Sequence, residues 1–383
     1  SAEKRDESLQ DISQAVSALT DSDLENKNIE SFVDLSAIVP GVTVSKNEGY
    51  KTVISIRGVG NETNQNAIAA PSVAFHIDGV FIASPFSLLS DFIDIDRIEV
   101  LRGPQGTLFG QNSTGGAINV ISKKPTTDDY YGKADVTLGN YDLLKYRSSV
   151  NIPINEKVAT RFSFSSTERD GFSENIVNGQ DLDDANNLSL RSDWVIETSE
   201  TSSLRIFAQY FDIDRNGAAM RGIDDQTAGI RHLAQDTLSN QELTSKVFAA
   251  IYEQDLGYAN LKILASSQED DISVTRDNDR HNLGETVAAI PGLEGTTYIK
   301  AEFRPETSLV ETKTLEVNLI SNEPILNGKL DWVAGAFYMD HKIENHIKGY
   351  RDWDANGEIK YVCDEPFANP DYCYTHNYSF PAA

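Results

Sequence analysis

The sequence predicts an antiparallel membrane β-barrel that follows a small N-terminal α/β domain. A glycine-rich strand–loop–strand unit occupies residues 94–125. From residue 132 onward, apolar and polar residues alternate with period two over segments about as long as barrel strands, about 9–11 residues. Charged residues lie at the centres of the polar faces, where a wet barrel lumen tolerates them. We therefore divide the chain into residues 1–125 and 126–383.

The N-terminal domain is predicted to combine short strands with one helix. Residues 12–16 and 42–44 have the apolar content of short strands. Residues 28–38 place apolar side chains at helical spacing, and Pro40–Gly41 would end that helix.

The glycine-rich unit joins two strand-like stretches, residues 95–100 and 117–121. Five glycines within residues 103–116 permit tight turns and close backbone approach, because glycine accepts backbone angles that other residues resist. A nucleotide-binding loop would need Lys and Ser or Thr after its last glycine, and this loop has no such Lys. The remaining alternative is a glycine-rich connector in an ordinary soluble domain.

The barrel region is predicted to contain about nine strands. In residues 144–152 one face is mostly apolar, whereas the other carries Lys145 and Arg147. A soluble β-sandwich would also alternate, but its dry core would not hold charges such as Arg161 and Asp193 at strand centres. The other predicted strands lie near residues 132–139, 158–164, 188–196, 203–212, 243–254, 258–268, 312–321 and 329–341.

The connections between these strands differ in length. Short turns on one side of a sheet and long loops on the other are typical of outer-membrane barrels. The predicted short turns are residues 140–142 and 155–156. The predicted long connections lie within residues 169–187, 214–241, 270–310 and 342–383.

Composition narrows the class of partner. A formal net charge of −26 disfavours nucleic acid, whose phosphates require a basic surface. Hydrophobic residues make up 39% of the chain, without the run of about 18 apolar residues that a membrane-spanning helix needs. The polar N-terminus shows no secretory signal, so we expect a mature or trimmed chain.

Three segments, in this order and spacing, resemble the plug-domain signature of TonB-dependent outer-membrane receptors. They are residues 55–60 (SIRGVG), residues 73–80 (VAFHIDGV), and residues 98–120 with their IEVLRGP and GGAINV motifs. Residues 2–11 (AEKRDESLQD) resemble the stretch just after the TonB box, so the box itself would lie upstream of or at the start of the chain.

The resemblance implies a plug inside a barrel that closes with about 22 strands. About nine of these are predicted here, and an open sheet edge would leave polar groups unsatisfied in lipid. We therefore expect the remaining strands to be encoded beyond Ala383, with a separate chain completing the barrel as the alternative.

By the same resemblance, the function would be energised uptake of a scarce nutrient across the outer membrane of a Gram-negative bacterium. TonB would be the protein partner, outer-membrane lipid would surround the barrel, and no cofactor is expected. An iron–siderophore complex is the default cargo, with an oligosaccharide or a vitamin as alternatives. No enzyme is expected, because the six histidines are scattered and no metalloprotease or nucleophile motif occurs.

Two rival classes stay open from the sequence. A passive porin would lack a plug, and residues 1–125 count against it. A secreted β-rich enzyme acting on polysaccharide would need a cleft with paired carboxylates, and the abundant Asp and Glu residues do not exclude one.

The resemblance also implies roles for particular plug residues. Four charged residues would form ion pairs between plug and barrel, because an unpaired buried charge is costly; the alternative is solvent exposure. These are Arg57, Arg97, Glu99 and Arg102. Plug loops at residues 61–69 and 81–89 would face the outside, and their predicted ligand contacts are Asn64, Gln65, Asn66 and Phe86.

Two further features lie near the C-terminus. Cys363 and Cys373 predict a local disulfide in an oxidising compartment; two free thiols, or a metal pair with His376, are the alternatives. Asp352, Asp354 and Asn356 resemble the start of a calcium loop, but Cys363 occupies the position of its closing acid. A hairpin tip at Asn356–Gly357 is therefore preferred over a metal site.

Overall fold

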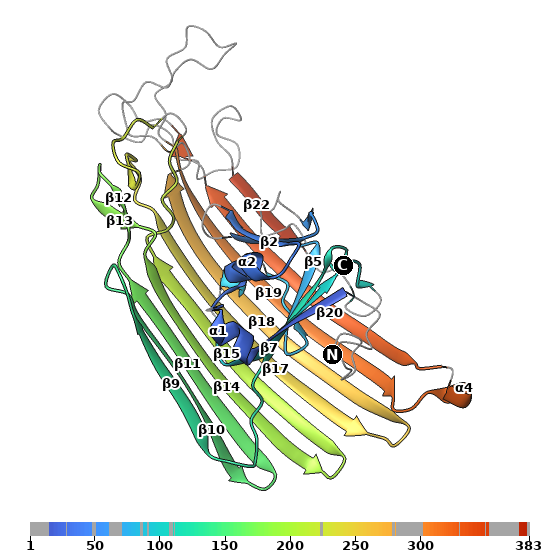
Figure 1. Cartoon of the computed structure of the whole chain (residues 1–383). Helices are drawn as coiled ribbons and strands as arrows, with labels where there is room; N and C mark the ends of the chain where they lie inside the picture. Colours follow the sequence, from blue (N-terminus) through green and yellow to red (C-terminus); the bar gives the residue numbers. More distant parts are fainter. Residues whose placement is uncertain are drawn as a thin grey trace.

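The structure is a computed structural model in which an N-terminal domain packs against one face of a large antiparallel sheet (Figure 1). We call this the covered face of the sheet, and the opposite face the outer face. Among the described residues, no helix is long and apolar enough to cross a bilayer. The structure describes residues 15–27, 29–47, 51–60, 71–84, 87–89, 92–106, 110, 112–222, 225–277, 280, 302–328, 330–348, 350–351 and 375–380.

The N-terminal domain contains two small sheets, with strand orders β1-β7-β8-β5-β6 and β2-β3-β4. Strands β5 and β8 are parallel, whereas β7 runs antiparallel to both of its neighbours. Its elements are β1 (Ala15–Thr20), α1 (Asp21–Asn26), η1 (Phe32–Asp34), α2 (Leu35–Ile38), β2 (Val42–Asn47), β3 (Lys51–Ile56), β4 (Val59–Gly60), β5 (Val73–Ile77), β6 (Val80–Phe81), η2 (Ser87–Leu89), β7 (Ile95–Arg102) and β8 (Gly116–Ser122).

The helix predicted over residues 28–38 is shorter than expected and is divided into η1 and α2. The carboxylate of Asp34 accepts hydrogen bonds from the backbone N–H groups of Glu30 (3.0 Å) and Ser31 (2.8 Å). Because short acidic side chains compete in this way for backbone donors, they start a new turn rather than continue a helix. Strand β1 includes Ala15 and Val16 of the strand predicted over residues 12–16 and continues to Thr20, whereas residues 12–14 lie outside the described residues.

The core of the N-terminal domain is continuous with the sheet that it contacts. Phe32 is 1% exposed and meets Phe75 and Phe92 edge-to-face, with ring centroids 4.6 and 4.5 Å apart. The same apolar cluster includes Phe207, Val247, Ala249, Ile251 and Leu264 of the large sheet. Burial of apolar area at this boundary therefore stabilises both parts together.

The large sheet confirms the nine predicted strands and makes most of them longer. Its order is β22-β20-β19-β18-β17-β15-β14-β11-β10-β9, and β21 pairs with β19. The strands are β9 (Tyr131–Leu138), β10 (Leu144–Asn155), β11 (Val158–Arg169), β14 (Ala185–Ser199), β15 (Ser202–Arg215), β17 (Asn240–Asp255), β18 (Ala259–Asp277), β19 (Glu302–Ser321), β20 (Val333–Lys348), β21 (Tyr350–Arg351) and β22 (Thr375–Phe380).

Most short connections lie at one end of the large sheet and the long ones at the other. The turns after β10, β14 and β17 are short, whereas the connections after β11, β15 and β18 are long. One prediction is wrong: the short turn at residues 140–142 lies at the long-loop end, where the Tyr141 carbonyl accepts from Asp170 N–H. A small sheet within the long connections contains β12 (Ser173–Asn175), β13 (Gln180–Leu182) and β16 (His232–Leu233), and α4 (Ile325–Gly328) follows β19.

Gly116 begins β8 at a point where no side chain fits. Its φ of +149° is rare for other residues, and an added Cβ would lie 2.2 Å from the Leu101 carbonyl oxygen. Gly103 also has a positive φ, +108°, but a Cβ there would meet no atom within 4 Å. The two glycines therefore separate the cost of backbone strain from the cost of a collision.

We predict that Gly116→Ala lowers the free energy of unfolding of the N-terminal domain by more than about 3 kcal/mol, because strain and collision add. Gly103→Ala, which carries strain alone, should cost only about 1–2 kcal/mol. Urea titration followed by limited proteolysis of residues 15–122 measures both. Equal costs would contradict the close approach of β7 and β8.

Candidate functional site at the contact between the N-terminal domain and the large sheet

The centre of the contact is the side chain of Asp78, which is 0% exposed. Asp78 occupies the turn between β5 and β6 with φ +52°, and its N–H donates to the Val120 carbonyl (2.8 Å). This turn aims its carboxylate at the large sheet. There Arg191 Nη2 lies 2.6 Å from Asp78 Oδ2, and Arg205 Nη1 lies 3.2 Å from Oδ1. Ser122 adds donations from its N–H (3.0 Å) and its hydroxyl (2.5 Å).

A second carboxylate, from the large sheet itself, completes this network. Asp193 Oδ2 lies 3.0 Å from Arg191 Nη2 and 2.6 Å from Arg205 Nη2. The Arg191 guanidinium also stacks over the Phe207 ring, 4.1 Å from its centroid. Two guanidinium groups thus meet two carboxylates away from water, and this pairing is what makes their burial tolerable.

The charge state of Asp78 follows from these neighbours. Burial alone raises the pKa of its carboxyl group. The positive charges of Arg191 and then Arg205, with the hydrogen bonds from Ser122, outweigh burial and hold that pKa below its ordinary value. Asp78 is therefore ionised in the folded protein at neutral pH.

A second contact joins Asp94, just before β7, to β11. Arg161 Nη2 lies 2.7 Å from Asp94 Oδ1, Arg161 Nε donates to Oδ2, and the Ser163 hydroxyl donates at 2.7 Å. A guanidinium that meets a carboxylate through two nitrogens fixes orientation as well as distance. Asp94 has φ +54°, so a tight turn again presents the acid.

Two acidic side chains of the N-terminal domain reach the first strands of the sheet. Glu30 lies 2.9 Å from Lys145 Nζ and 3.3 Å from Arg147 Nη1, both on β10. Glu25 pairs with Lys133 of β9.

At β19 the signs of charge are exchanged, because there the N-terminal domain supplies the cation and the sheet supplies the carboxylate. Lys51 of β3 lies 3.4 Å from Glu306 of β19, and both side chains are 1% exposed. Nearby, the Ser87 hydroxyl donates to Asp270 of β18 (2.8 Å). Paired groups therefore tie the N-terminal domain to strands from β9 to β19.

The four charged residues predicted to join plug and barrel have different surroundings. Arg97 pairs with Asp96 (2.8 Å) and Glu99 (2.9 Å), all within the N-terminal domain. Arg57 is exposed, and Arg102 is half-buried with no partner for its Nε among the described residues. Pairing of these four residues with barrel charges stays a prediction.

The other predicted site residues lie outside the described residues. These are Asn64, Gln65, Asn66, Phe86, Asp352, Asp354, Asn356, Cys363 and Cys373. Their proposed roles in ligand contact, calcium binding and a disulfide are not tested. Within the described part of the chain, no three His, Cys, Asp or Glu residues are placed to hold a metal ion.

Sequence reasoning missed the acids Asp78 and Asp94 as contact residues. Both stand at a turn next to a buried strand, and one belongs to the VAFHIDGV motif. Among their basic partners, Arg161 and Arg191 stand out in the sequence only as charges at strand centres, and Arg205 does not stand out at all. The usable signal was the combination of an acid at a strand end with arginines on the polar faces of later strands.

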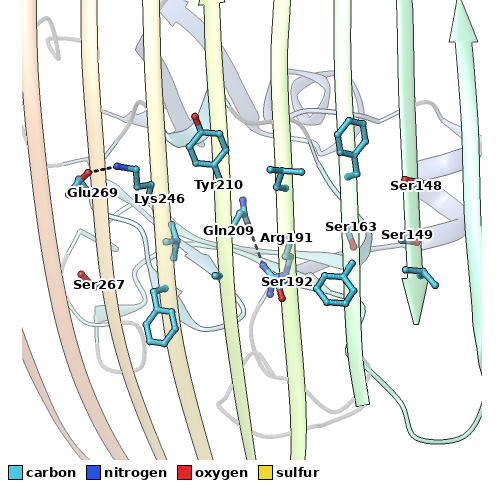
Figure 2. Close-up of a pocket in the computed structure, with 17 residues that line it drawn as sticks. Ser148, Ser149, Ser163, Arg191, Ser192, Gln209, Tyr210, Lys246, Ser267 and Glu269 are labelled. Atoms are coloured by element: carbon cyan, nitrogen blue, oxygen red, sulfur yellow. Dashed lines mark hydrogen bonds and ion pairs between the residues drawn. The ribbon is translucent and has the colours of Figure 1, made fainter. Parts of the chain in front are cut away.

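A groove of about 720 Å³ lies on the outer face, away from this contact (Figure 2). Exposed apolar side chains such as Phe162, Leu190 and Phe248 line it, and Lys246 and Glu269 pair at its margin (2.8 Å). It is open to the surroundings of the sheet, and its lining includes Ser163 and Arg191, whose side chains make contacts described above on the covered face.

Comparisons with known proteins agree with this arrangement. The family model "TonB-dependent Receptor Plug Domain" matches residues 8–117. The ferripyoverdine receptor of Pseudomonas aeruginosa is 30% identical over 139 residues, covering 36% of this chain and 16% of that protein. The vitamin B12 transporter of Vibrio vulnificus is 28% identical over 165 residues, 43% of this chain and 26% of that protein.

One solved structure illustrates the fold. The ferric yersiniabactin uptake receptor of Yersinia pestis superposes with a TM-score of 0.65 at 16% identity. The superposition covers 96% of this chain and 60% of that receptor. This chain therefore corresponds to an N-terminal domain and part of a barrel, and it matches less than a fifth of the ferripyoverdine receptor's length.

We predict that Asp78→Asn loosens the N-terminal domain, lowering its free energy of unfolding by about 3 kcal/mol, because Arg191 and Arg205 lose a buried counter-charge. Asp96→Asn is the matched control. Its carboxylate is 48% exposed beside Arg97, so the cost should stay below about 1 kcal/mol. The urea midpoint for protease sensitivity of residues 15–122 reports both. Equal midpoints for the two variants would argue against a central role for Asp78.

We also predict how acid affects this contact. The folded pKa of Asp78 is lower than its ordinary value of 3.8, so its stabilising contribution is complete above that value. The contribution is lost as the pH falls through the folded pKa. Between pH 2 and pH 7, wild type should lose more unfolding free energy than Asp78→Asn, with the difference developing below about pH 4. Parallel pH profiles would show that Asp78 is not ion-paired.

Proposed function

Since the chain belongs to the TonB-dependent receptors, with their plug domain and part of their barrel, we propose that it serves energised uptake of a scarce nutrient through the outer membrane of a Gram-negative bacterium. The most strongly supported cargo is an iron–siderophore complex. TonB would supply the force that moves the plug, and the ligand would pass without covalent change.

The observation that carries this proposal is that the N-terminal domain occupies the covered face of the large sheet. Buried ion pairs and an apolar cluster hold it there. A passive porin conducts through an open lumen and would be blocked by a domain that is ion-paired to the lumen wall. A receptor that opens only when force is applied needs such a domain.

The outer face supports a position in the membrane. Starting from the long-loop end of each of four described strands, the outer face carries charged residues down to a limit and none beyond it. The last charged residue, which marks this limit, is Glu168 on β11, Asp212 on β15, Lys246 on β17 and Asp340 on β20. In the pairing register, this limit moves two residues toward the short-turn end from β11 to β15, from β15 to β17 and from β17 to β20. Between the neighbouring strands β17 and β18 it does not move, because Lys246 pairs with Glu269. Beyond it, the outer face of these described strands carries no charge. Because barrel strands tilt by about 35–45°, a lipid-facing band at constant height must shift along them in this way.

The names of similar proteins support the choice of cargo. Ferripyoverdine and ferric yersiniabactin are the ligands named for two of them, and vitamin B12 for a third. We therefore place an iron chelate first and a vitamin second. An oligosaccharide is a further alternative.

We propose no enzymatic activity for the chain, because the matched family model and the named relatives are receptors and transporters. The rival polysaccharide-acting enzyme would need free, paired carboxylates. Three of the buried carboxylates at the domain contact, those of Asp78, Asp94 and Asp193, are instead bound to arginines.

Growth and uptake by a deletion strain test the proposal. We predict that the strain fails to grow on one member of a panel of ferric siderophores, vitamins and oligosaccharides when that member is the sole source. Uptake of that nutrient by the parent strain should stop when a protonophore collapses the proton-motive force, while binding persists. Uptake that survives the protonophore would indicate a passive porin, and unimpaired growth on the whole panel would contradict nutrient transport.

A further inference from the structure

Six basic side chains gather on the covered face of five neighbouring strands, β9 to β15. All six contact carboxylates of the N-terminal domain, and together they form what we call the basic arc. The arc consists of Lys133, Lys145, Arg147, Arg161, Arg191 and Arg205. Arg169 and Arg215 continue the same face at the long-loop ends of β11 and β15.

The negative charge that balances the arc comes mainly from the plug. Two carboxylates of the sheet, Asp135 and Asp193, lie among the six cations. The other counter-charges are plug residues, Glu25 and Glu30 together with Asp78 and Asp94. When the plug is in place the arc is neutral, and when the plug moves away the arc keeps a net positive charge.

This concentration of positive charge is confined to one side of the sheet. The whole chain carries a formal net charge of −26, so a basic interior surface is not a result of composition. On β18 and β19 the sheet presents Asp270 and Glu306 to the plug instead, and one cation, Arg276 of β18, lies 3.9 Å from Glu306 on the same face. The interior therefore has a basic side and a side that is neutral or acidic.

Holding the plug in place does not by itself require a basic arc. Strands β17 and β18 meet the plug through apolar side chains, among them Val247, Ala249 and Leu264. Buried ion pairs stabilise a contact no better than apolar residues of similar volume, because desolvation of the charges offsets their attraction. We therefore look for the role of the basic arc in the open receptor, after the plug has moved away from these six side chains.

We propose that the basic arc guides an anionic cargo through the barrel once the plug is displaced. The proposal rests on the proposed function and adds the charge class of its substrate, a metal chelate or other nutrient with net negative charge. Rows of Arg and Lys give pores their preference for anions, and low-dielectric walls concentrate the field of such rows. In the resting receptor the plug carboxylates mask the arc, so the path forms only on opening.

The local potential can be measured with charged thiol reagents at a reporter cysteine. Ser165 lies on the covered face of β11, opposite Arg147, and is 2% exposed. Ser266 is the matched control, a 9% exposed serine on the covered face of β18, opposite Ala249. Ser165→Cys and Ser266→Cys are made in the full-length receptor, and the purified protein is treated with urea until each introduced thiol just becomes reactive.

Reaction rates are then compared for an anionic sulfonatoethyl and a cationic trimethylammonioethyl methanethiosulfonate. Each rate is divided by the rate of the same reagent with 2-mercaptoethanol. In the Ser165→Cys variant, a potential of about one kT would favour the anionic reagent by about sevenfold, and added salt should reduce that ratio. In the Ser266→Cys variant we expect a ratio near or below one. Adding Asp94→Asn with Arg161→Gln to Ser165→Cys removes one cation together with its plug partner and should lower the ratio.

Equal ratios in the two reporter variants would overturn the proposal. So would a ratio in the Ser165→Cys variant that ignores both salt and the added double substitution. The assay uses neither cargo nor TonB. Failure of nutrient uptake would therefore count against the proposed function without changing this ratio, and the two ideas can fail separately.

Discussion

The structure depends on the pairing of Asp78 with Arg191 and Arg205. A carboxylate that is 0% exposed can stay ionised only if cations are fixed around it, and here they come from two neighbouring strands of the large sheet. The geometry begins in the sequence, because the turn between β5 and β6 turns the acid outward from the plug core. The turn that holds Asp78 thus fixes one point at which a domain of about one hundred residues contacts the large sheet.

The contact combines two kinds of interaction with different consequences for opening. Apolar burial on β15, β17 and β18 holds the plug without directionality and resists its removal over a broad area. Ion pairs on β9 to β15 set orientation and lose their low-dielectric advantage as soon as water enters. Asp193 stays with Arg191 and Arg205 when Asp78 leaves, so the sheet is not left with two wholly uncompensated arginines. If the proposed function is right, this arrangement suits a domain that is firmly placed at rest and displaced by force.

Much of the fold could be predicted from the sequence, because period-two alternation is a local property of each strand. The strands near Tyr146, Phe162 and Trp194 illustrate this, and charges at their centres distinguished a wet interior from a sandwich core. Strand lengths, the position of the turn at residues 140–142 and the division of the predicted helix depended on pairing and capping that a single stretch does not reveal. The site was harder still. Asp78 and Arg205 are 127 residues apart, and nothing local in either segment indicates that they meet.

If paired charges hold the N-terminal domain against the covered face, Asp78 and Arg191 must be energetically coupled, and a double-mutant cycle between these two residues measures that coupling. Asp78→Asn, Arg191→Gln and the double variant would be made in the full-length receptor, and the urea midpoint for release of the N-terminal domain would be measured in outer-membrane vesicles. We predict a coupling free energy of about 1–3 kcal/mol, so that the double variant loses less stability than the sum of the two single variants. Additive effects, with no coupling between the two positions, would contradict this prediction.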